Sequence, residues 1–243
     1  MRNLVLSGLT ILMMLNFAAC ADHPSHPSHA SESIHWWEHA PFFLAPDAVP
    51  VRTVLPSPPA PHSPVDDQDH AELLRLQSTR SVADCQRAGL EVGISLDSFY
   101  GPGHGPLTQS ELAKWTTFME EVTTDTDYFV RNVKKQWKRP RPFRAFSDIH
   151  PCVPLESSSA YPSGHTTISR TMADVLSFIY PDRKAQFMAR ADQVASDRVL
   201  GGVHHPSDIE AGKKLGDAIY AALASNARFI AELRKQQDES ENR

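Results

Sequence analysis

The sequence predicts an all-α protein, a bundle of helices, and three observations support that prediction. Apolar residues recur three, four and seven positions apart in several long stretches of the chain. Capping residues precede these stretches and prolines or glycines follow them, as expected at the two ends of a helix. No stretch of any length alternates apolar and polar residues in the manner of a half-buried strand, and no internal repeat is present.

The clearest helix lies in the first half of the domain. The first helical pattern covers residues 66–83, with aspartates in its first turn, whereas residues 89–99 give no clear pattern. Residues 101–106 are rich in glycine and proline and form a predicted loop. The clearest helix then begins with the capping-box signature Thr108–Glu111 and runs toward Trp137, beyond which prolines end it. Its apolar positions are Leu112, Trp115, Met119, Val122, Phe129, Val130 and Val133.

Three further helices are predicted in the second half of the chain. Residues 143–160 form a loop, and a helix over residues 163–179 follows it. The next helix carries apolar positions from residue 187 to residue 200, after which two glycines break the chain. A histidine and a proline open the last helix, whose apolar positions continue over residues 205–233.

The chain begins with a predicted secretory signal peptide, residues 1–21. A short basic start precedes the apolar run Leu4–Ala19, which is too short for a good membrane span. Small residues permit cleavage after Ala21, and lipid modification of Cys20 is the alternative. Either route predicts an exported protein, periplasmic or anchored to a membrane through lipid on Cys20.

Residues 22–66 are predicted to be a linker, because segments rich in proline, histidine and serine bury too little apolar surface to offset the entropy of ordering. Weak metal binding by the histidines is an alternative role. Four aromatic residues are exceptions that pack on the domain or contact a partner: Trp36, Trp37, Phe42 and Phe43. The predicted helical domain covers residues 67–235, and the charged residues 236–243 form a frayed tail.

Charge and cysteine usage narrow the function classes. The formal net charge of -5 over 243 residues provides no basic field for nucleic acid, and no later run is apolar enough to span a bilayer. Loss of Cys20 from the fold leaves Cys85 and Cys152, an even pair in an oxidising compartment. A disulfide and two buried free thiols both fit this pair. Nothing in the sequence indicates the oligomeric state.

Three separated stretches carry groups suited to binding a phosphate. Lys134, Arg141 and Arg198 supply cations that neutralise phosphate oxygens, and arginine binds them bidentately. Ser163 and Gly164 open a helix, where unpaired backbone N–H groups and the helix dipole favour an anion. Glycine also lets the backbone approach the anion closely.

Two histidines and a carboxylate supply groups for attack and proton transfer. His204 and Asp208 are four apart and share a face if the helix begins near His204, so the carboxylate fixes the imidazole tautomer and supports its positive charge. His205 is three residues from Asp208 and is an equal partner by geometry alone. His165 follows the Ser-Gly turn and is a candidate proton donor. Taken singly, each residue also has an ordinary structural interpretation, such as a solvated lysine or a first-turn acid.

Together these stretches resemble the phosphatidic-acid-phosphatase type 2 and vanadium haloperoxidase superfamily, and most of all its class A bacterial nonspecific acid phosphatases. The signature of that family is Lys-x6-Arg-Pro, then Pro-Ser-Gly-His, then Ser-Arg-x5-His-x3-Asp. The matching residues are Lys134, Arg141 and Pro142, the run Pro162–His165, and Arg198, His204 and Asp208. Asp197 stands where the family has serine, and an acid facing inward there would repel the substrate.

The resemblance implies a role for each matching residue. His204 is the nucleophile that forms a phosphohistidine, Asp208 orients it, and His165 is the general acid; the register selects His204 over His205 and Arg141 over Arg139. The implied phosphate-binding residues are Lys134, Arg141, Ser163, Gly164 and Arg198. The resemblance further implies a helical bundle with the site at helix ends, no metal, and inhibition by vanadate.

The leading hypothesis is an exported, metal-independent acid phosphatase that acts on small phosphomonoesters. One alternative is a lipid phosphate or diphosphate phosphatase, because a soluble domain that is tethered to a membrane can reach lipid headgroups. Another is a haloperoxidase that uses vanadate as its cofactor. A catalytically dead binding protein is the third, and Asp197 is its only support.

Overall fold

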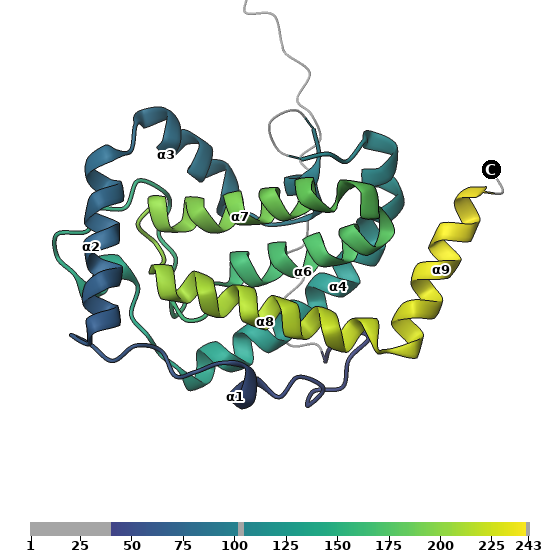
Figure 1. Cartoon of the computed structure of the whole chain (residues 1–243), viewed down its shortest axis with the longest axis horizontal. Helices are drawn as coiled ribbons and strands as arrows, with labels where there is room; N and C mark the ends of the chain where they lie inside the picture. The colour runs from purple at the N-terminus through teal and green to yellow at the C-terminus, as the bar shows by residue number, and fades with distance from the viewer. Residues whose placement is uncertain (1–39, 102–104, 242–243) are drawn as a thin grey trace, which may run out of the picture. The chain divides into compact units, whose positions relative to one another are not determined.

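The computed structural model describes residues 40–101 and 105–241, and in this part of the chain the predicted all-α class is confirmed. The β pairing among these residues is limited to an isolated bridge between Tyr100 and Leu107. No described helix has the length and apolar character needed to cross a membrane. The elements (Figure 1) are α1 Val51–Val54, α2 Pro64–Thr79, α3 Val82–Gly89, η2 Leu90–Val92, η3 Leu96–Phe99, α4 Gln109–Gln136, α5 Pro142–Ala145, α6 Gly164–Ile179, η4 Pro181–Arg183, α7 Lys184–Leu200, α8 Pro206–Ala224 and α9 Ala227–Glu241.

Some predictions concern residues outside the described part of the chain. These are the signal peptide of residues 1–21, the lipid modification of Cys20, and the first part of the linker, residues 22–39. Trp36 and Trp37, which were predicted to pack on the domain or contact a partner, also lie outside it. All of these stay predictions.

Helix α6 lies between α7 and α8 and packs against α4 (Figure 1). Most of its side chains are buried, including hydroxyl residues that bond to a carbonyl four residues earlier. Thr167 Oγ1 donates to Ser163 O at 2.8 Å, and Thr171 Oγ1 donates to Thr167 O at 3.0 Å. These bonds satisfy polar groups that would otherwise be unfavourable to bury, so a helix with many small polar residues can form the centre of the bundle.

Two glycines let α8 approach α6 closely. A Cβ atom at Gly212 would lie 2.9 Å from Ser163 O, and one at Gly216 would lie 2.9 Å from Arg170 Cβ. Any larger residue would therefore push the two helices apart. The close approach brings the start of α8 beside the start of α6, where Ser163 N donates to Asp208 O at 3.0 Å.

Helix α4 begins with the predicted capping box. Thr108 Oγ1 accepts from Glu111 N at 3.3 Å, and the Glu111 carboxylate accepts from Thr108 N at 2.8 Å. Glu111 also accepts from Arg183, just before α7, at 3.0 Å. The predicted apolar positions are buried except for the half-buried Leu112. This long helix delivers Lys134 to the candidate site in its last turn.

The prediction of a linker over residues 22–66 is wrong for residues 40–66. Four of their apolar side chains are buried in the main core: Phe43, Leu44, Val49 and Leu55. The backbone N–H groups of Phe43 and Leu44 donate to the carboxylate of Asp125 on α4 at 3.0 Å and 2.9 Å. Composition alone missed this, because a few apolar residues suffice once a buried carboxylate satisfies the backbone beside them.

The predicted helix boundaries are wrong where side chains cap the backbone. The helix expected over residues 66–83 is two helices, because Ser81 caps α3 and accepts from Asp84 N at 3.1 Å. The helix expected over residues 205–233 also divides, because Asn226 Oδ1 accepts a backbone N–H at 2.9 Å at the start of α9. Hydrophobic periodicity does not register such caps. Helix α9 continues through most of the predicted frayed tail, and α5 interrupts the predicted loop after residue 143.

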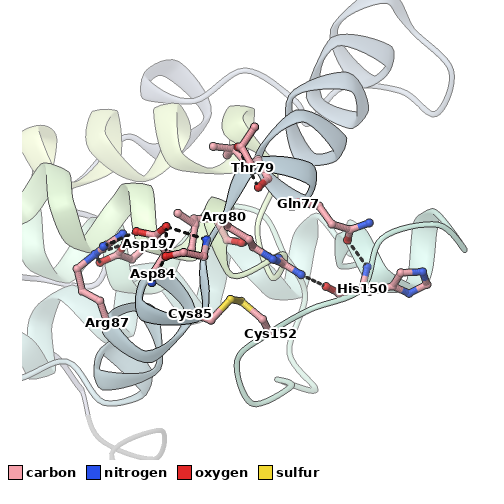
Figure 2. Close-up of a disulfide and its surroundings, with 12 residues drawn as sticks. Gln77, Thr79, Arg80, Asp84, Cys85, Arg87, His150, Cys152 and Asp197 are labelled. Carbon is pink, nitrogen blue, oxygen red and sulfur yellow. Dashed lines mark hydrogen bonds and ion pairs between the residues drawn. A yellow bond between two sulfur atoms is a disulfide. The ribbon is translucent and has the colours of Figure 1, made fainter.

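Cys85 of α3 and Cys152 are joined by a disulfide, with their Cα atoms 5.7 Å apart (Figure 2). Cys152 lies in the segment between α5 and α6, which we call the 146–163 loop. Side chains of the α2–α3 region hold the same loop: Arg80 donates to His150 O, and Gln77 Nε2 donates to Asp148 O at 2.9 Å. The loop is therefore fixed at its first half before it reaches the candidate site.

Candidate active site

Helix ends meet at the candidate site. The predicted residues and their positions are Lys134 at the end of α4, Arg141 before α5, Ser163, Gly164 and His165 at the start of α6, Arg198 at the end of α7, and His204 and Asp208 around the start of α8. Hydrogen bonds and ion pairs connect these residues, apart from Gly164, directly or through the 146–163 loop. No group of three or more metal-binding side chains forms among the described residues.

His204 is held between a carboxylate and a guanidinium. Its Nε2 accepts from Arg141 Nη1 at 2.8 Å, because a guanidinium can only donate. The ring proton therefore lies on Nδ1, which donates to Asp208 Oδ2 at 3.3 Å. Burial, together with Arg141, lowers the pKa of His204 well below its ordinary value. The imidazole is consequently neutral, with the lone pair of Nε2 facing the cations.

His205 shares the same carboxylate but lies in a different environment. Its backbone N and its Nδ1 contact Asp208 Oδ2 at 2.8 Å and 2.9 Å. Its Nε2 has no hydrogen-bond partner among the described residues, and its ring lies edge-on to Phe146. Burial opposes ionisation of Asp208, but hydrogen bonds from His204 and His205 outweigh it and hold its pKa well below the usual range. Of the two histidines, it is His204 that meets Arg141.

Arg139 supports the site although it does not belong to the family motif. It donates to Asp208 Oδ1 at 2.8 Å, the oxygen opposite the one that the histidines use. It also donates to Asp66 and Asp69 of α2, at 3.0 Å and 2.9 Å, and to Ser207 Oγ at 2.6 Å. Arg139 is buried and so locks α2 to the start of α8 beneath the site. Arg139-Pro repeats the dipeptide of Arg141-Pro, and Asp66 in the first turn of α2 was the available signal for one of its partners.

Arg141 and Arg198 are oriented by carbonyls and joined by one carboxylate. Arg141 donates to Val203 O at 2.9 Å and to Ser158 O at 2.8 Å, and Arg198 Nη1 donates to a backbone carbonyl at 3.4 Å. One oxygen of Glu156 accepts from Arg141 Nη2, and the other accepts from Arg198 Nη2. Sequence patterns gave no signal for Glu156, because it lies in an irregular loop without periodicity.

Lys134 is half-buried near Arg141, and its Nζ donates to Ser159 O. Burial, together with the positive charge of Arg141, lowers its pKa to about 7. The ammonium is therefore sensitive to any further charge that enters the site. A bound anion would favour its protonated form, so binding of a phosphate and charging of Lys134 reinforce each other.

Ser163 caps α6 at the site. Its Oγ accepts from Thr166 N at 3.3 Å and from Thr166 Oγ1 at 2.9 Å. The first N–H groups of a helix have no partner within it, so the start of α6 offers donors for an anion. A Cβ atom at Gly164 would contact Val130 at an ordinary 3.4 Å, so packing within the fold does not require glycine there.

His165 faces Glu156 with one nitrogen and a backbone carbonyl with the other. Its Nε2 lies 3.1 Å from Val92 O, and its Nδ1 lies 3.9 Å from Glu156 Oε1. Burial, with a further contribution from Arg198, lowers the pKa of His165 to about 4. The imidazole is therefore an acid strong enough to give up a proton readily once it is protonated.

Asp197 does not face the phosphate-binding side chains. Its buried carboxylate accepts from Arg87 of α3, with Nη2–Oδ1 at 3.0 Å and Nε–Oδ1 at 3.2 Å (Figure 2). The acid that replaces the family serine is thus neutralised by an arginine on the neighbouring helix. It ties α3 to the last turns of α7, next to Arg198, and adds no unpaired negative charge to the site.

Comparisons with known proteins identify relatives of this chain and a likeness of fold. A family model described as the PAP2 superfamily matches residues 122–229. A non-specific acid phosphatase of Providencia stuartii is 30% identical over 203 residues, which cover 79% of this chain and 81% of that protein. A non-specific acid phosphatase of Salmonella typhimurium is 26% identical over 211 residues, covering 82% and 83%. The structure of a bacterial vanadium-dependent iodoperoxidase matches with a TM-score of 0.59 at 20% identity, over 88% of this chain and 62% of that one, which is a likeness of fold alone.

Proposed function

Because this chain belongs to the PAP2 superfamily and is homologous to the bacterial non-specific acid phosphatases, we propose that it hydrolyses phosphomonoesters through a phosphohistidine on His204. Its homology makes it a phosphatase, a phosphoric monoester hydrolase. One observation carries the covalent step: the lone pair of His204 Nε2 faces Arg141, while Asp208 holds the Nδ1 proton. A neutral imidazole in that tautomer is a nucleophile.

The first step transfers the phosphoryl group to the enzyme. Arg141, Arg198 and Lys134 neutralise the phosphate oxygens, and the start of α6 adds backbone donors. His204 Nε2 attacks phosphorus, the bond from phosphorus to the ester oxygen breaks, and His165 gives its proton to that oxygen. The imidazole of His204 now carries positive charge, which Asp208 stabilises.

The second step returns the enzyme to its starting state. His165, now neutral, removes a proton from a water molecule as the water oxygen attacks phosphorus. The bond between phosphorus and His204 Nε2 breaks, and its electron pair returns to the imidazole. Inorganic phosphate leaves, and His165 carries the proton needed for the next cycle.

We propose that no metal ion takes part, because the three cations already supply the charge that a metal would bring to the phosphate. Vanadate would then act as an inhibitor that takes the place of the phosphoryl group. Export is also part of the proposal: the predicted signal peptide of residues 1–21, or lipid on Cys20, supports it, and so does the Cys85–Cys152 disulfide, which suits an oxidising compartment.

The covalent step is tested by trapping the intermediate. The protein is mixed with phosphate-labelled p-nitrophenyl phosphate and quenched in alkaline detergent, because phosphohistidine is labile in acid, and the labelled peptide is sequenced. We expect label on His204, none in His204→Ala, and no turnover by that variant. Label on His205, or turnover of His204→Ala comparable to the parent, would refute the assignment.

A further inference from the structure

The carboxylate of Glu156 binds the guanidinium groups of Arg141 and Arg198, the two groups that bind phosphate in the proposed mechanism. Its two oxygens accept separately from Arg141 and Arg198, and one of them lies 3.9 Å from His165 Nδ1. A carboxylate held in this way presents two oxygens to a pair of arginine forks, as a phosphate does. Glu156 and a substrate phosphate therefore compete for the same donors.

This contact belongs to the interior of the site. The side chains of Arg141 and Arg198 are 1% exposed, and that of Glu156 is 29% exposed. Burial opposes ionisation of Glu156, but Arg141 and His165 outweigh it and hold its pKa at about 2. Cys152 and Ser158, on either side of Glu156 in the loop, are fixed by the disulfide and by Arg141 respectively. The competitor is thus an ionised group held in place by its own loop.

We propose that Glu156 is a specificity-determining residue, whose tethered carboxylate competes for Arg141 and Arg198 and selects dianionic phosphomonoesters over monoanionic phosphodiesters. The inference rests on the proposed function of this site. A tethered group acts at a high effective concentration, of the order of mM for short flexible tethers, so a weak competitor cannot displace it.

Charge decides which ligands can displace the carboxylate. A phosphomonoester carries about -1.5 to -2 at pH 7, whereas a diester carries a single negative charge. Exchanging Glu156 for a diester leaves the negative charge beside the arginines unchanged. Exchanging it for a dianion adds attraction to the cations of Arg141, Arg198 and Lys134. The carboxylate therefore excludes diesters and admits monoesters.

The test compares Glu156→Gln with the parent and with Asp148→Asn. Glutamine keeps the size of the side chain and removes its charge, and Asp148 is a half-exposed acid on the same loop, so its variant controls for the loss of one charge. Calorimetry measures the Kd of inorganic phosphate at pH 7. Turnover is measured with p-nitrophenyl phosphate, a monoester, and bis(p-nitrophenyl) phosphate, a diester.

We expect Glu156→Gln to bind phosphate about tenfold more tightly or better, and its ratio of diester to monoester kcat/KM to rise by about tenfold or more. Asp148→Asn should stay within about twofold of the parent in both measurements, since an exposed pair contributes little. An unchanged or weaker phosphate Kd in Glu156→Gln, or an unchanged ratio, would overturn the proposal. If circular dichroism shows that Glu156→Gln does not fold, Glu156→Asp is measured in its place. The shorter side chain of aspartate cannot span both arginines, so an unchanged phosphate Kd in that variant would overturn the proposal.

The two hypotheses fail in different ways. A parent protein that hydrolyses neither ester contradicts the proposed function. The phosphate Kd of Glu156→Gln still tests whether Glu156 competes with phosphate for the two arginines. If the parent hydrolyses the monoester but Glu156→Gln has the same phosphate Kd and the same substrate ratio as the parent, the proposed function stands. In that case Glu156 does not determine specificity.

Discussion

Replacing Arg139 by methionine tests whether the ion network behind Asp208 holds the active site together. Methionine fills similar space but leaves three carboxylates, those of Asp66, Asp69 and Asp208, without the cation that they share. Removing one partner of a buried ion pair typically costs about 3 to 5 kcal/mol. Asp208 keeps its histidines and Asp69 keeps Ser207 N at 3.0 Å, so those residual bonds favour the lower half of that range.

Urea unfolding followed by circular dichroism measures this loss. A domain is stable by only about 5 to 15 kcal/mol, so the transition midpoint of Arg139→Met should fall sharply at an unchanged slope. Arg75→Met is the matched control, since it breaks an exposed pair with Glu72 on the same α2 helix, and its midpoint should match the parent. Arg139→Lys should recover part of the loss, because an ammonium keeps the charge but not the planar fork.

Catalysis provides a second measurement on the same variants. Arg139 acts through Asp208 and does not touch substrate, so Arg139→Lys should lower kcat more than it raises KM. A loss of stability below about 1 kcal/mol in Arg139→Met would refute the reasoning, because it would mean that the three carboxylates do not depend on this cation.

Three further outcomes follow from the site and the loop. His165→Ala should lower turnover of alkyl phosphates by roughly 10² to 10⁴ but that of p-nitrophenyl phosphate far less, because a nitrophenolate leaves without a proton; equal losses would exclude a general acid. In the parent, kcat/KM should fall as the pH rises above about 4, the pKa of His165, because the imidazolium form of the free enzyme is lost, and a pH profile that His165→Ala leaves unchanged would contradict this. Reduction of the Cys85–Cys152 disulfide, which closes a loop with a sequence separation of 67, should lower the free energy of unfolding by roughly 4 kcal/mol. It should also lower activity, because it releases the 146–163 loop. Thermal melts and turnover with and without reductant measure these two effects, and unchanged values would show that other contacts hold the loop.

Prediction from the sequence succeeded where a signal is local. The helix opened by Thr108 carries both a capping box and an unbroken apolar face, and α6 and α7 end where proline and glycine require it. The matching residues of the three separated stretches were grouped through the resemblance to the family, since each of them alone also has an ordinary structural interpretation. Capping boxes, apolar faces and helix breakers depend only on neighbours within a turn or two, which is why a single sequence contains them.

The remainder depends on partners far apart in the chain. Residues 40–66 pack on the bundle because Asp125, on α4, accepts their backbone N–H groups. Glu156 reaches Arg198 across 42 residues, and Arg139 reaches Asp66 across 73. No pattern within a window of the sequence specifies such pairs, because the charge of one member does not indicate where the other will lie after folding.

The cations of this site are oriented largely by main-chain oxygens. Arg141 donates to the carbonyls of Val203 and Ser158, and Lys134 donates to the carbonyl of Ser159. A carbonyl is present whatever side chain its residue carries, so these contacts survive substitution as long as the backbone keeps its path. Mutational drift or laboratory evolution can therefore exchange the side chain of Val203 or Ser159 without removing the oxygen that orients Arg141 or Lys134.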